Sequence, residues 1–558
     1  EDEGLFTPEV KGGKDDVVAF VKNIQSKVNA QEGNTLPVST FTDYADGSTP
    51  SGSAAYEKRG IAVDIPVWQS ENCIQCNRCA YVCPHAVIRP VALTEDELAK
   101  APEGTKAIDM IGMPGMKFTM TVSAYDCTGC GSCVNVCPGK KGEKALVMAN
   151  MEENAAEQDI FDFGREIEVK PEVVAKFKPE TVKGSQFKQP LLEFSGACAG
   201  CGETPYAKLI TQLFGDRMYI ANATGCSSIW GNSSPSTPYT VNAKGQGPAW
   251  SNSLFEDNAE FGYGMLLAQK AIRGGLKEKV ESVMAYEGSS EEVKAACQEW
   301  LDTFGSGITN GAATDKLVAA LEGVDCDVCK DIVKNKDFLA KKSQWIFGGD
   351  GWAYDIGFGG VDHVLASGQD INVMVFDTEV YSNTGGQSSK STPTGAIAQF
   401  AAGGKEVKKK DMASIAMSYG YVYVAQIAMG ADFNQTVKAI AEAEAYPGPS
   451  LIIAYAPCIN HGIKKGMSKA QTEEELAVKC GYWHNFRFNP AAENKFTLDS
   501  KAPTEDYQAF LDGEVRYNSL KRSNPEKAAR LFAKNESEAK ARYEYLNKLV
   551  TLYGKTEE

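Results

Sequence analysis

Apolar residues in this chain fall into short runs that alternate with helical patterns from about residue 190 onward. The strand-like runs lie at 345–347, 372–376, 421–428 and 451–455, and the helical patterns between them at 354–367 and 434–444. Strand, helix, strand order of this kind predicts parallel strands joined by crossover helices. We therefore expect an α/β fold built on a doubly wound sheet.

Three other segments depart from this alternation. A helix-rich, charged excursion lies between Ile272 and Lys342, and a charged, helical stretch from Pro503 to Gly554 is expected to wrap around the sheet domain. Near the start, a helical pattern over 15–28 precedes a Thr, Ser and Gly-rich segment over 34–53. Such a segment is typical of a linker or arm rather than a domain.

Composition narrows the class of protein. The chain has 558 residues, of which 43% are hydrophobic and 23% charged, so it is globular and too long for a single core. The formal net charge of -16 argues against nucleic acid as a partner. No apolar run approaches the roughly 20 residues of a membrane span, and the start lacks an initiator Met and a signal-peptide pattern. We expect a cytoplasmic protein, and a piece of a longer polypeptide.

Eight of the sixteen cysteines form two copies of one spacing, each closed by a proline. The copies are Cys73, Cys76, Cys79, Cys83 and Cys127, Cys130, Cys133, Cys137. This is the bacterial ferredoxin run, in which the fourth cysteine ligates the other cluster. We expect one [4Fe–4S] cluster on Cys73, Cys76, Cys79 and Cys137, and another on Cys83, Cys127, Cys130 and Cys133. Residues 89–121 are then an insertion between the two halves.

Two other interpretations of these cysteines fit less well. Zinc sites commonly use separated cysteine pairs that close a tetrahedron, unlike these two runs of four cysteines, which we call the first and second ladder. Disulfides are expected in an oxidising compartment, which the absence of a secretory pattern does not favour.

With the ferredoxin-like module placed, the expected domains are 1–54 as an arm or linker, 55–170 as the module, 171–545 as the sheet domain and 546–558 as a tail.

A second candidate site follows the apolar run 345–347. The turn Gly348-Gly349-Asp350-Gly351 opens a helical pattern, and glycines and a helix N-terminus suit a phosphate group. A carboxylate there would repel phosphate unless a cation lay between them, so Asp350 indicates Mg²⁺ bridging a diphosphate. An ordinary turn between strand and helix is the alternative. The loop 377–386, after the next apolar run, offers hydroxyl, amide and carbonyl groups to the same cation.

A third cysteine group stands apart from the ladders. Cys198 and Cys201 form a CxxC pair, while Cys226 and Cys458 each follow a strand-like run. Ligands of an open α/β sheet gather beyond the carboxyl ends of its strands, so these four thiols could meet beside Asp350 and Thr378. Single buried cysteines that only fill the core are the alternative.

Together the glycine loop and the later Asn-bearing loop resemble the thiamine diphosphate signature. That resemblance implies Mg²⁺ on Asp350, Thr378 and the Val380 carbonyl, with Asn383 toward thiazolium and substrate. Thr378 departs from the commoner Asn ligand. With the separate CxxC pair, Cys226, Cys458 and the ferredoxin-like module, the chain resembles the carboxy-terminal half of the pyruvate:ferredoxin oxidoreductase family.

The family resemblance implies further site residues. Residues that hold or border the cofactor are Glu203, Cys226, Gly349, Asp350, Gly351, Trp352, Thr378, Glu379, Val380, Tyr381, Ser382 and Asn383. A third [4Fe–4S] cluster is expected on Cys198, Cys201, Cys226 and Cys458. The implied reaction is oxidative decarboxylation of pyruvate with coenzyme A to acetyl-CoA and CO₂, with electrons leaving to ferredoxin or flavodoxin. Expected partners also include the amino-terminal domains of the enzyme and a second copy in a homodimer.

Two rival functions remain open at this stage. A sister enzyme acting on 2-oxoglutarate or indolepyruvate would share the chemistry and differ in its substrate pocket. An electron-relay subunit without thiamine diphosphate would keep the cysteines alone, and Asp350 and Thr378 argue against it. Cys326 and Cys329 form one more CxxC pair, in the helical excursion, for which a surface thiol pair or redox disulfide competes with no function.

Overall fold

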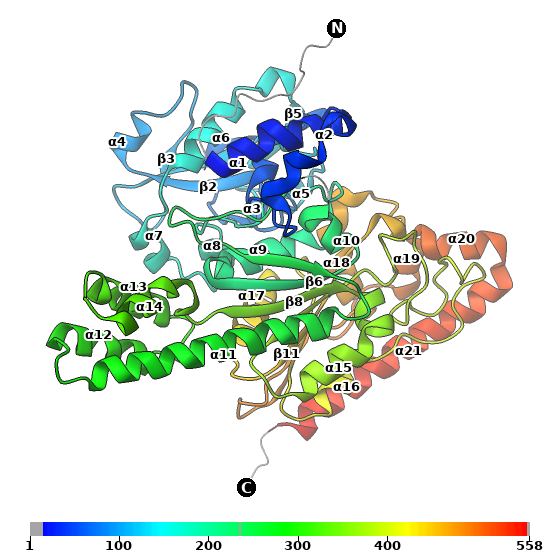
Figure 1. Ribbon diagram of the computed structural model, residues 1–558. Coiled ribbons are helices and arrows are strands. Elements are labelled where there is room, and N and C mark those ends of the chain that lie inside the picture. Colours follow the sequence, from blue (N-terminus) through cyan, green and yellow to red (C-terminus); the bar gives the residue numbers. More distant parts are fainter. Residues whose placement is uncertain (1–14, 234–235, 555–558) are drawn as a thin grey trace.

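The computed structural model describes residues 15–233 and 236–554. Its N-terminal, cysteine-rich module lies at the top of Figure 1, above a large sheet and the helices that cover it. Three helices at the far end of α11 (Asn258–Ala285) form a lobe on the left, and the long helix α21 (Pro525–Leu552) runs down the right side. Among the helices of this described part, none is both long and apolar enough to cross a membrane.

The large sheet has eight strands in the order β13-β12-β10-β11-β9-β8-β6-β7. From β10 to β7 in this order all neighbours are parallel, whereas β12 and β13 add an antiparallel edge. The strands are β6 (Met218–Ala223), β7 (Ala249–Ser253), β8 (Ser343–Gly349), β9 (Asn372–Asp377), β10 (Tyr423–Ile427), β11 (Ser450–Tyr455), β12 (Phe486–Phe488) and β13 (Phe496–Leu498). The expected runs are strands of this sheet, which confirms the α/β class.

Both faces of the sheet are covered, as a doubly wound fold requires. Along β8, Trp345 and Phe347 pack on the face covered by α9 (Thr204–Phe214) and α17 (Phe433–Ala445). The alternate residue Ile346 packs on the opposite face with α15 (Phe358–Ala366), α11 and α21. Strand residues that are apolar on both faces explain the continuous apolar runs in the sequence.

The cysteine-rich module is a small α+β unit. Strand β1 (Asp64–Trp68) pairs antiparallel with β5 (Leu146–Asn150), and each cysteine ladder enters a short helix, α3 (Arg78–Tyr81) or α5 (Ser132–Val136). The expected insertion 89–121 forms the three-stranded sheet of β2 (Ile88–Leu93), β4 (Lys117–Val122) and β3 (Ile108–Asp109). The helix α6 (Glu157–Glu166) packs on β4.

Buried polar contacts join this module to the sheet domain. The ammonium group of Lys208 in α9 donates to the carbonyls of Ala80 and Tyr81 in the module, and the Tyr81 hydroxyl donates to the carbonyl of Phe433 at 3.0 Å. Burial lowers the pKa of Lys208 to about 8. Leaving these buried carbonyl groups without a hydrogen bond would cost free energy. The contacts therefore favour one relative position of the two units.

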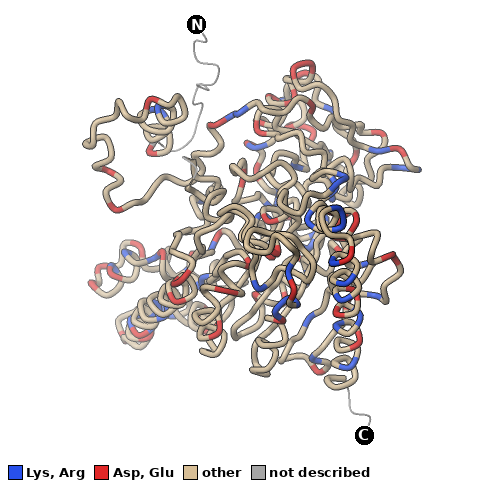
Figure 2. Tube along the Cα trace, turned by 90° about the vertical axis from the view of Figure 1, so that its right-hand side faces the viewer, with Lys and Arg blue, Asp and Glu red and all other residues tan. Residues whose placement is uncertain are grey.

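The helical excursion forms a lobe with its own apolar core. Helices α12 (Glu291–Asp302), α13 (Asn310–Leu321) and α14 (Asp327–Lys334) pack around the fully buried Trp300 against the C-terminal half of α11. Figure 2 shows Lys and Arg interspersed with Asp and Glu along the chain, including the helix that leads to the C-terminus. Residues of opposite charge therefore follow one another closely along the chain in this view.

The boundary expected at residue 545 falls inside the helix α21. Leu546 and Leu549, beyond that boundary, belong to the same buried core as the strands β9 and β11. The helical pattern expected over 503–554 thus continues past the boundary, which cuts through a single helix. Residues 546–552 are thus packed against the sheet domain rather than free of it.

We expect Leu546→Ala to lower the free energy of unfolding by about 2–5 kcal/mol, since a fully buried leucine leaves a cavity. Leu552→Ala is the matched control, because Leu552 is 70% exposed, and its effect should stay within about 0.5 kcal/mol. Urea unfolding followed by circular dichroism measures both. Equal effects of the two substitutions would show that the end of α21 does not belong to the core.

Candidate functional site

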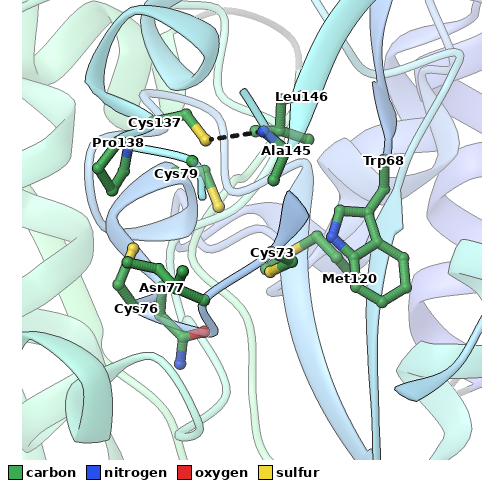
Figure 3. A pocket seen from close by; sticks show the side chains of 12 residues that line it. Trp68, Cys73, Cys76, Asn77, Cys79, Met120, Cys137, Pro138, Ala145 and Leu146 are labelled. Atoms are coloured by element: carbon green, nitrogen blue, oxygen red, sulfur yellow. Dashed lines mark hydrogen bonds between the residues drawn. The ribbon is translucent and has the colours of Figure 1, made fainter. Parts of the chain in front are cut away.

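Three cysteines of the first ladder and one of the second surround a pocket in the cysteine-rich module. Figure 3 shows the thiols of Cys73, Cys76, Cys79 and Cys137 around it, with Trp68 at one side. Burial raises the pKa of Cys79, and the neighbouring thiolates of Cys76, Cys73 and Cys137 raise it further. The structure thus brings together the four residues of the crossed assignment, which we name the distal thiol set.

The other four cysteines of the ladders form the middle thiol set, Cys83, Cys127, Cys130 and Cys133. Burial raises the pKa of Cys133, and Cys130, Cys83 and Cys127 raise it further as near neighbours. Four thiolates of like charge would repel one another in this buried position. Cationic iron removes that repulsion, so both sets suit an iron–sulfur cluster.

The backbone of the ladders turns in the same way in both copies. Gln75 and Asn77 adopt left-handed φ angles of 55° and 60°, and Gly129 and Gly131, at the same places in the second copy, adopt 66° and 76°. These turns aim backbone amides at sulfur. The Gln75 amide lies 3.4 Å from the Cys73 sulfur, and the Gly129 amide lies 3.3 Å from that of Cys127. Amide donors to sulfur tune the potential of bound clusters.

Cys198, Cys201, Cys226 and Cys458 also come together, although they lie up to half the chain apart. Burial raises the pKa of Cys226, as do Glu203 and the thiolates of Cys201 and Cys458. Burial likewise raises that of Cys458 to about 11, with a contribution from Cys198. We call these four residues the inner thiol set.

The middle and inner thiol sets are neighbours. Burial and Cys83 raise the pKa of Cys130, while hydrogen bonds from Ser132 and from the amide of Gly200, between Cys198 and Cys201, lower it. His85, two residues after Cys83, also forms a hydrogen bond of 2.9 Å with the carbonyl of Ala197. The loops that carry the two sets are therefore in direct contact.

A second pocket opens at the carboxyl ends of β6 and β8. Of the residues expected to surround the cofactor, it is lined by Glu203, Cys226, Gly349, Gly351, Trp352, Val380, Tyr381, Ser382 and Asn383, and also by Thr224, Gly225, Ser227, Phe255 and Thr384. Gly351 is required here, because an added Cβ would lie 2.5 Å from the ring of Tyr381. The Cys226 sulfur lies 3.1 Å from the Ser382 hydroxyl, so the inner thiol set reaches this pocket.

Asp350, Thr378 and Val380 converge beneath the pocket. The Thr378 hydroxyl donates to Asp350 Oδ1 and lies 3.0 Å from that atom and 3.0 Å from the Val380 carbonyl. Burial raises the pKa of Asp350 well above its usual range, and Asp377 adds to this. The three converging oxygens are those of a buried carboxyl group, a hydroxyl group and a backbone carbonyl. Mg²⁺ prefers oxygen ligands, so this arrangement fits a cation beside a diphosphate.

Two residues at this point, Ser389 and His461, are not among the site residues expected from the sequence. The Ser389 hydroxyl donates to Asp350 Oδ2 at 2.6 Å, and the His461 ring lies 2.6 Å from the Thr378 carbonyl. The expected cofactor residue Glu379 instead turns its side chain away from the pocket, toward Lys409 at 2.9 Å and Arg516 at 2.9 Å. Its backbone has a φ of 60°, which redirects the side chain into the protein.

Glu379 belongs to a buried ion network behind the loop 377–383. Burial raises its pKa, but Lys409 and Arg516 outweigh that effect and bring the pKa to about 2. Arg516 also contacts Glu514 at 2.6 Å, and Lys409 contacts Asp377 at 2.8 Å. Lys409 lies in a run of three lysines, 408–410, but its ammonium group pairs with two buried carboxylates. No local pattern in the sequence predicts this, because the partners of Lys409 lie about thirty residues away in the chain.

The carboxyl group of Glu203 faces the pocket from the start of α9. Burial raises its pKa to about 7, and a hydrogen bond of 2.8 Å from the Trp230 indole opposes that shift. Glu203 therefore lines the pocket and lies near Cys226 and Cys458 of the inner thiol set.

The donor sets can be tested against the groups they would hold. In the described ranges 15–233 and 236–554, no group of three or more His, Cys, Asp or Glu side chains is arranged so that it could coordinate a single metal ion. The distal thiols instead surround a pocket, and a cubane needs such room, whereas zinc draws its sulfurs to about 2.3 Å. The residues present thus fit iron–sulfur clusters, and their role as ligands remains a prediction.

Three parts of the chain match known protein families. Residues 64–141 match the 4Fe-4S dicluster domain, and residues 333–454 match the thiamine pyrophosphate enzyme, C-terminal TPP binding domain. Residues 8–62 match a domain of unknown function. The two characterised domains coincide with the distal and middle thiol sets and with the loops that carry Asp350 and Thr378.

Relatives are similar over nearly the whole chain. The pyruvate-flavodoxin oxidoreductase of Enterobacter agglomerans is 56% identical over 551 residues, covering 96% of this chain and 46% of that protein. The pyruvate:ferredoxin oxidoreductase of Moorella thermoacetica is 57% identical over 544 residues, covering 95% and 46%. A solved 2-oxoglutarate:ferredoxin oxidoreductase from Magnetococcus marinus aligns with 15% identity over 48% of this chain and 65% of that chain, at a TM-score of 0.28, too low for any conclusion. The chain spans about half the length of these curated relatives, and over nearly all of its own length its sequence is similar to pyruvate:ferredoxin and pyruvate-flavodoxin oxidoreductases.

Proposed function

We propose that this chain supplies the cofactor site and the electron exit for oxidative decarboxylation of pyruvate, with coenzyme A accepting the acetyl group. Thiamine diphosphate, when bound, supplies the electron sink for decarboxylation, and iron–sulfur clusters supply one-electron carriers. Ferredoxin or flavodoxin would receive the electrons. The proposal rests on the names of the relatives together with the two pockets of this chain.

The observation that carries the proposal is the position of Cys226. It lines the pocket at the carboxyl ends of β6 and β8, and it is a neighbour of Cys201 and Cys458 in the inner thiol set. A cofactor in that pocket would therefore lie against the first electron carrier. A relay subunit without thiamine diphosphate would need neither this shared residue nor the buried oxygens of Asp350, Thr378 and Val380.

The thiol sets supply an order for electron transfer. The inner set touches the pocket, its loop touches the middle set through Gly200 and Ala197, and Cys133 of the middle set is a neighbour of Cys79 of the distal set. Electrons would leave the pocket through the inner, middle and distal sets in turn. The distal set would then face the acceptor protein.

The residues of the pocket have distinct proposed roles. Asp350, Thr378 and the Val380 carbonyl would hold Mg²⁺, because their oxygens already converge at hydrogen-bonding distance. Asn383 lines the open side of the pocket and would orient the substrate. The relatives named for pyruvate favour that substrate over 2-oxoglutarate or indolepyruvate.

The ligand sets predict about twelve iron atoms in the chain after anaerobic reconstitution, four for each set. Cys201→Ser should lower the count by about four, since only the inner set loses a ligand. Iron and sulfide analysis measures this. Cys297→Ser is the control and should keep about twelve, because Cys297 is buried in the helical lobe. About eight irons in the unchanged chain would refute the inner cluster.

Asp350→Ala should weaken thiamine diphosphate binding by more than about tenfold, since Mg²⁺ loses its charged ligand. Calorimetric titration with thiamine diphosphate and Mg²⁺ gives the affinity, and iron analysis should show that the clusters stay in place. Asp370→Ala is the control, because Asp370 pairs with Lys341 at the surface.

Asn383→Ala separates binding from orientation. It should bind thiamine diphosphate with an affinity close to that of the parent chain, because Asn383 is not among the converging oxygens. An Asp350→Ala protein that bound the cofactor as tightly as the Asn383→Ala protein would contradict the cation site.

Arg516→Met should lower the free energy of unfolding by about 3–5 kcal/mol, because the buried carboxyl groups of Glu379 and Glu514 would lose the cation that they share. The control is Arg530→Met, whose ion pair with Glu406 is exposed and worth about 0–1 kcal/mol. Restoring charge balance in Arg516→Met with Glu379→Gln should recover part of the loss in urea unfolding. A loss no larger than that of Arg530→Met would refute the network.

A further inference from the structure

One pair of cysteines lies outside all three thiol sets. Cys326 and Cys329 stand at the start of α14 in the helical lobe, whose apolar core is separate from both cores of the large sheet. Neither residue lines the cofactor pocket or the distal pocket. Their spacing therefore has no role in the proposed electron path.

The geometry brings the two sulfurs to one side of the first helical turn. Cys326 is the N-cap of α14, and its sulfur accepts a hydrogen bond of 3.4 Å from the backbone amide of Cys329, the third residue of the helix. Cys326 lies outside the helix as its N-cap, and its side chain interacts with that of Cys329, so a disulfide, which joins Cβ atoms about 3.5–4.5 Å apart, is within reach of the two side chains. The Cys329 thiol also donates to the Cys326 sulfur.

The two thiols differ in access and in acidity. Cys326 is partly exposed, and the thiol and amide of Cys329 lower its pKa by hydrogen bonding. Cys329 is 3% exposed, and burial raises its pKa to about 12. An accessible, acidified thiol beside a buried one is the arrangement in which one attacks an external disulfide and the other resolves it.

Other interpretations of the pair explain less. Cys297 lies close to Cys329, but within the described residues these three thiols do not form a group able to hold a metal ion. The adjacent Asp325 is paired with Lys330 at 2.6 Å and so is engaged elsewhere. Core filling explains the buried Cys297 and Cys329 but not a sulfur at the surface that caps the helix.

We propose that Cys326 and Cys329 form a reversible dithiol–disulfide site that exchanges with a glutathione-type or protein disulfide. The Cys326 thiolate attacks one sulfur of the external disulfide, which breaks its S–S bond and releases one thiolate. The Cys329 thiol then gives up its proton and attacks the Cys326 sulfur, and the second external thiol leaves. Two cysteine thiols are oxidised to one disulfide, and the external disulfide is reduced to two thiols by two electrons and two protons.

The test uses the anaerobically reconstituted 558-residue chain equilibrated with oxidised and reduced glutathione. After alkylation, mass spectrometry of the peptide with both cysteines should show loss of two hydrogens as the ratio becomes oxidising. Cys329→Ser should collect one glutathione on Cys326. Cys326→Ser should be modified at Cys329 at least about tenfold more slowly, because that thiol is buried. Cys480→Ser, a buried cysteine of the sheet domain, should behave like the parent.

Iron content is measured in each sample so that cluster loss is recognised. If both thiols of the parent chain remain open to alkylation at every glutathione ratio while iron is retained, the proposal is wrong. It is also wrong if the parent chain carries two glutathiones on this peptide, or if Cys326→Ser reacts as fast as Cys329→Ser. The parent measurements decide the matter even if a variant fails to fold.

Discussion

The meeting of strand ends at one edge of a parallel sheet is the constraint on which the rest of this molecule depends. Cys226 follows β6, Asp350 follows β8, Thr378 follows β9 and Cys458 follows β11, and these strands are neighbours in the sheet. Parallel pairing places all four carboxyl ends on the same side. Cys226 and Cys458, which are more than two hundred positions apart in the chain, are thereby brought to one edge of the sheet.

That edge collects negative charge, and the protein offsets it with buried cations. The acidic side chains of Asp350, Asp377 and Glu379 are all buried at this edge. Burying several carboxylates together without cations would cost free energy. Lys409 bridges Asp377 and Glu379, and Arg516 joins Glu379 to Glu514 in the C-terminal segment. The C-terminal helices therefore do more than cover the sheet, since they carry the cation that holds the loop after β9.

In the cysteine-rich module, a short stretch of backbone must turn tightly so that its cysteine sulfurs point to one place. Its two copies place left-handed residues at equivalent positions, with Gly129 and Gly131 in one copy and Gln75 and Asn77 in the other. Glycine adopts this conformation freely, whereas Gln is strained in it. The first copy compensates by hydrogen bonds, since the Gln75 side chain donates to the carbonyl of Asp109 at 2.7 Å and accepts from the amide of Ile111 at 2.8 Å.

The sequence by itself determined the elements whose signals are local. The spacing of the ladders, the Gly-Asp-Gly turn at Asp350 and the apolar runs of the sheet all lie within a few residues, so spacing and periodicity were enough to predict them. Tertiary structure alone decided the partners of Ser389, Lys409 and Arg516, the inward turn of Glu379, and the packing of Leu546 and Leu549 into the core of the sheet domain. Those contacts join residues far apart in the chain, and their energy comes from burial and charge pairing, which no local pattern records.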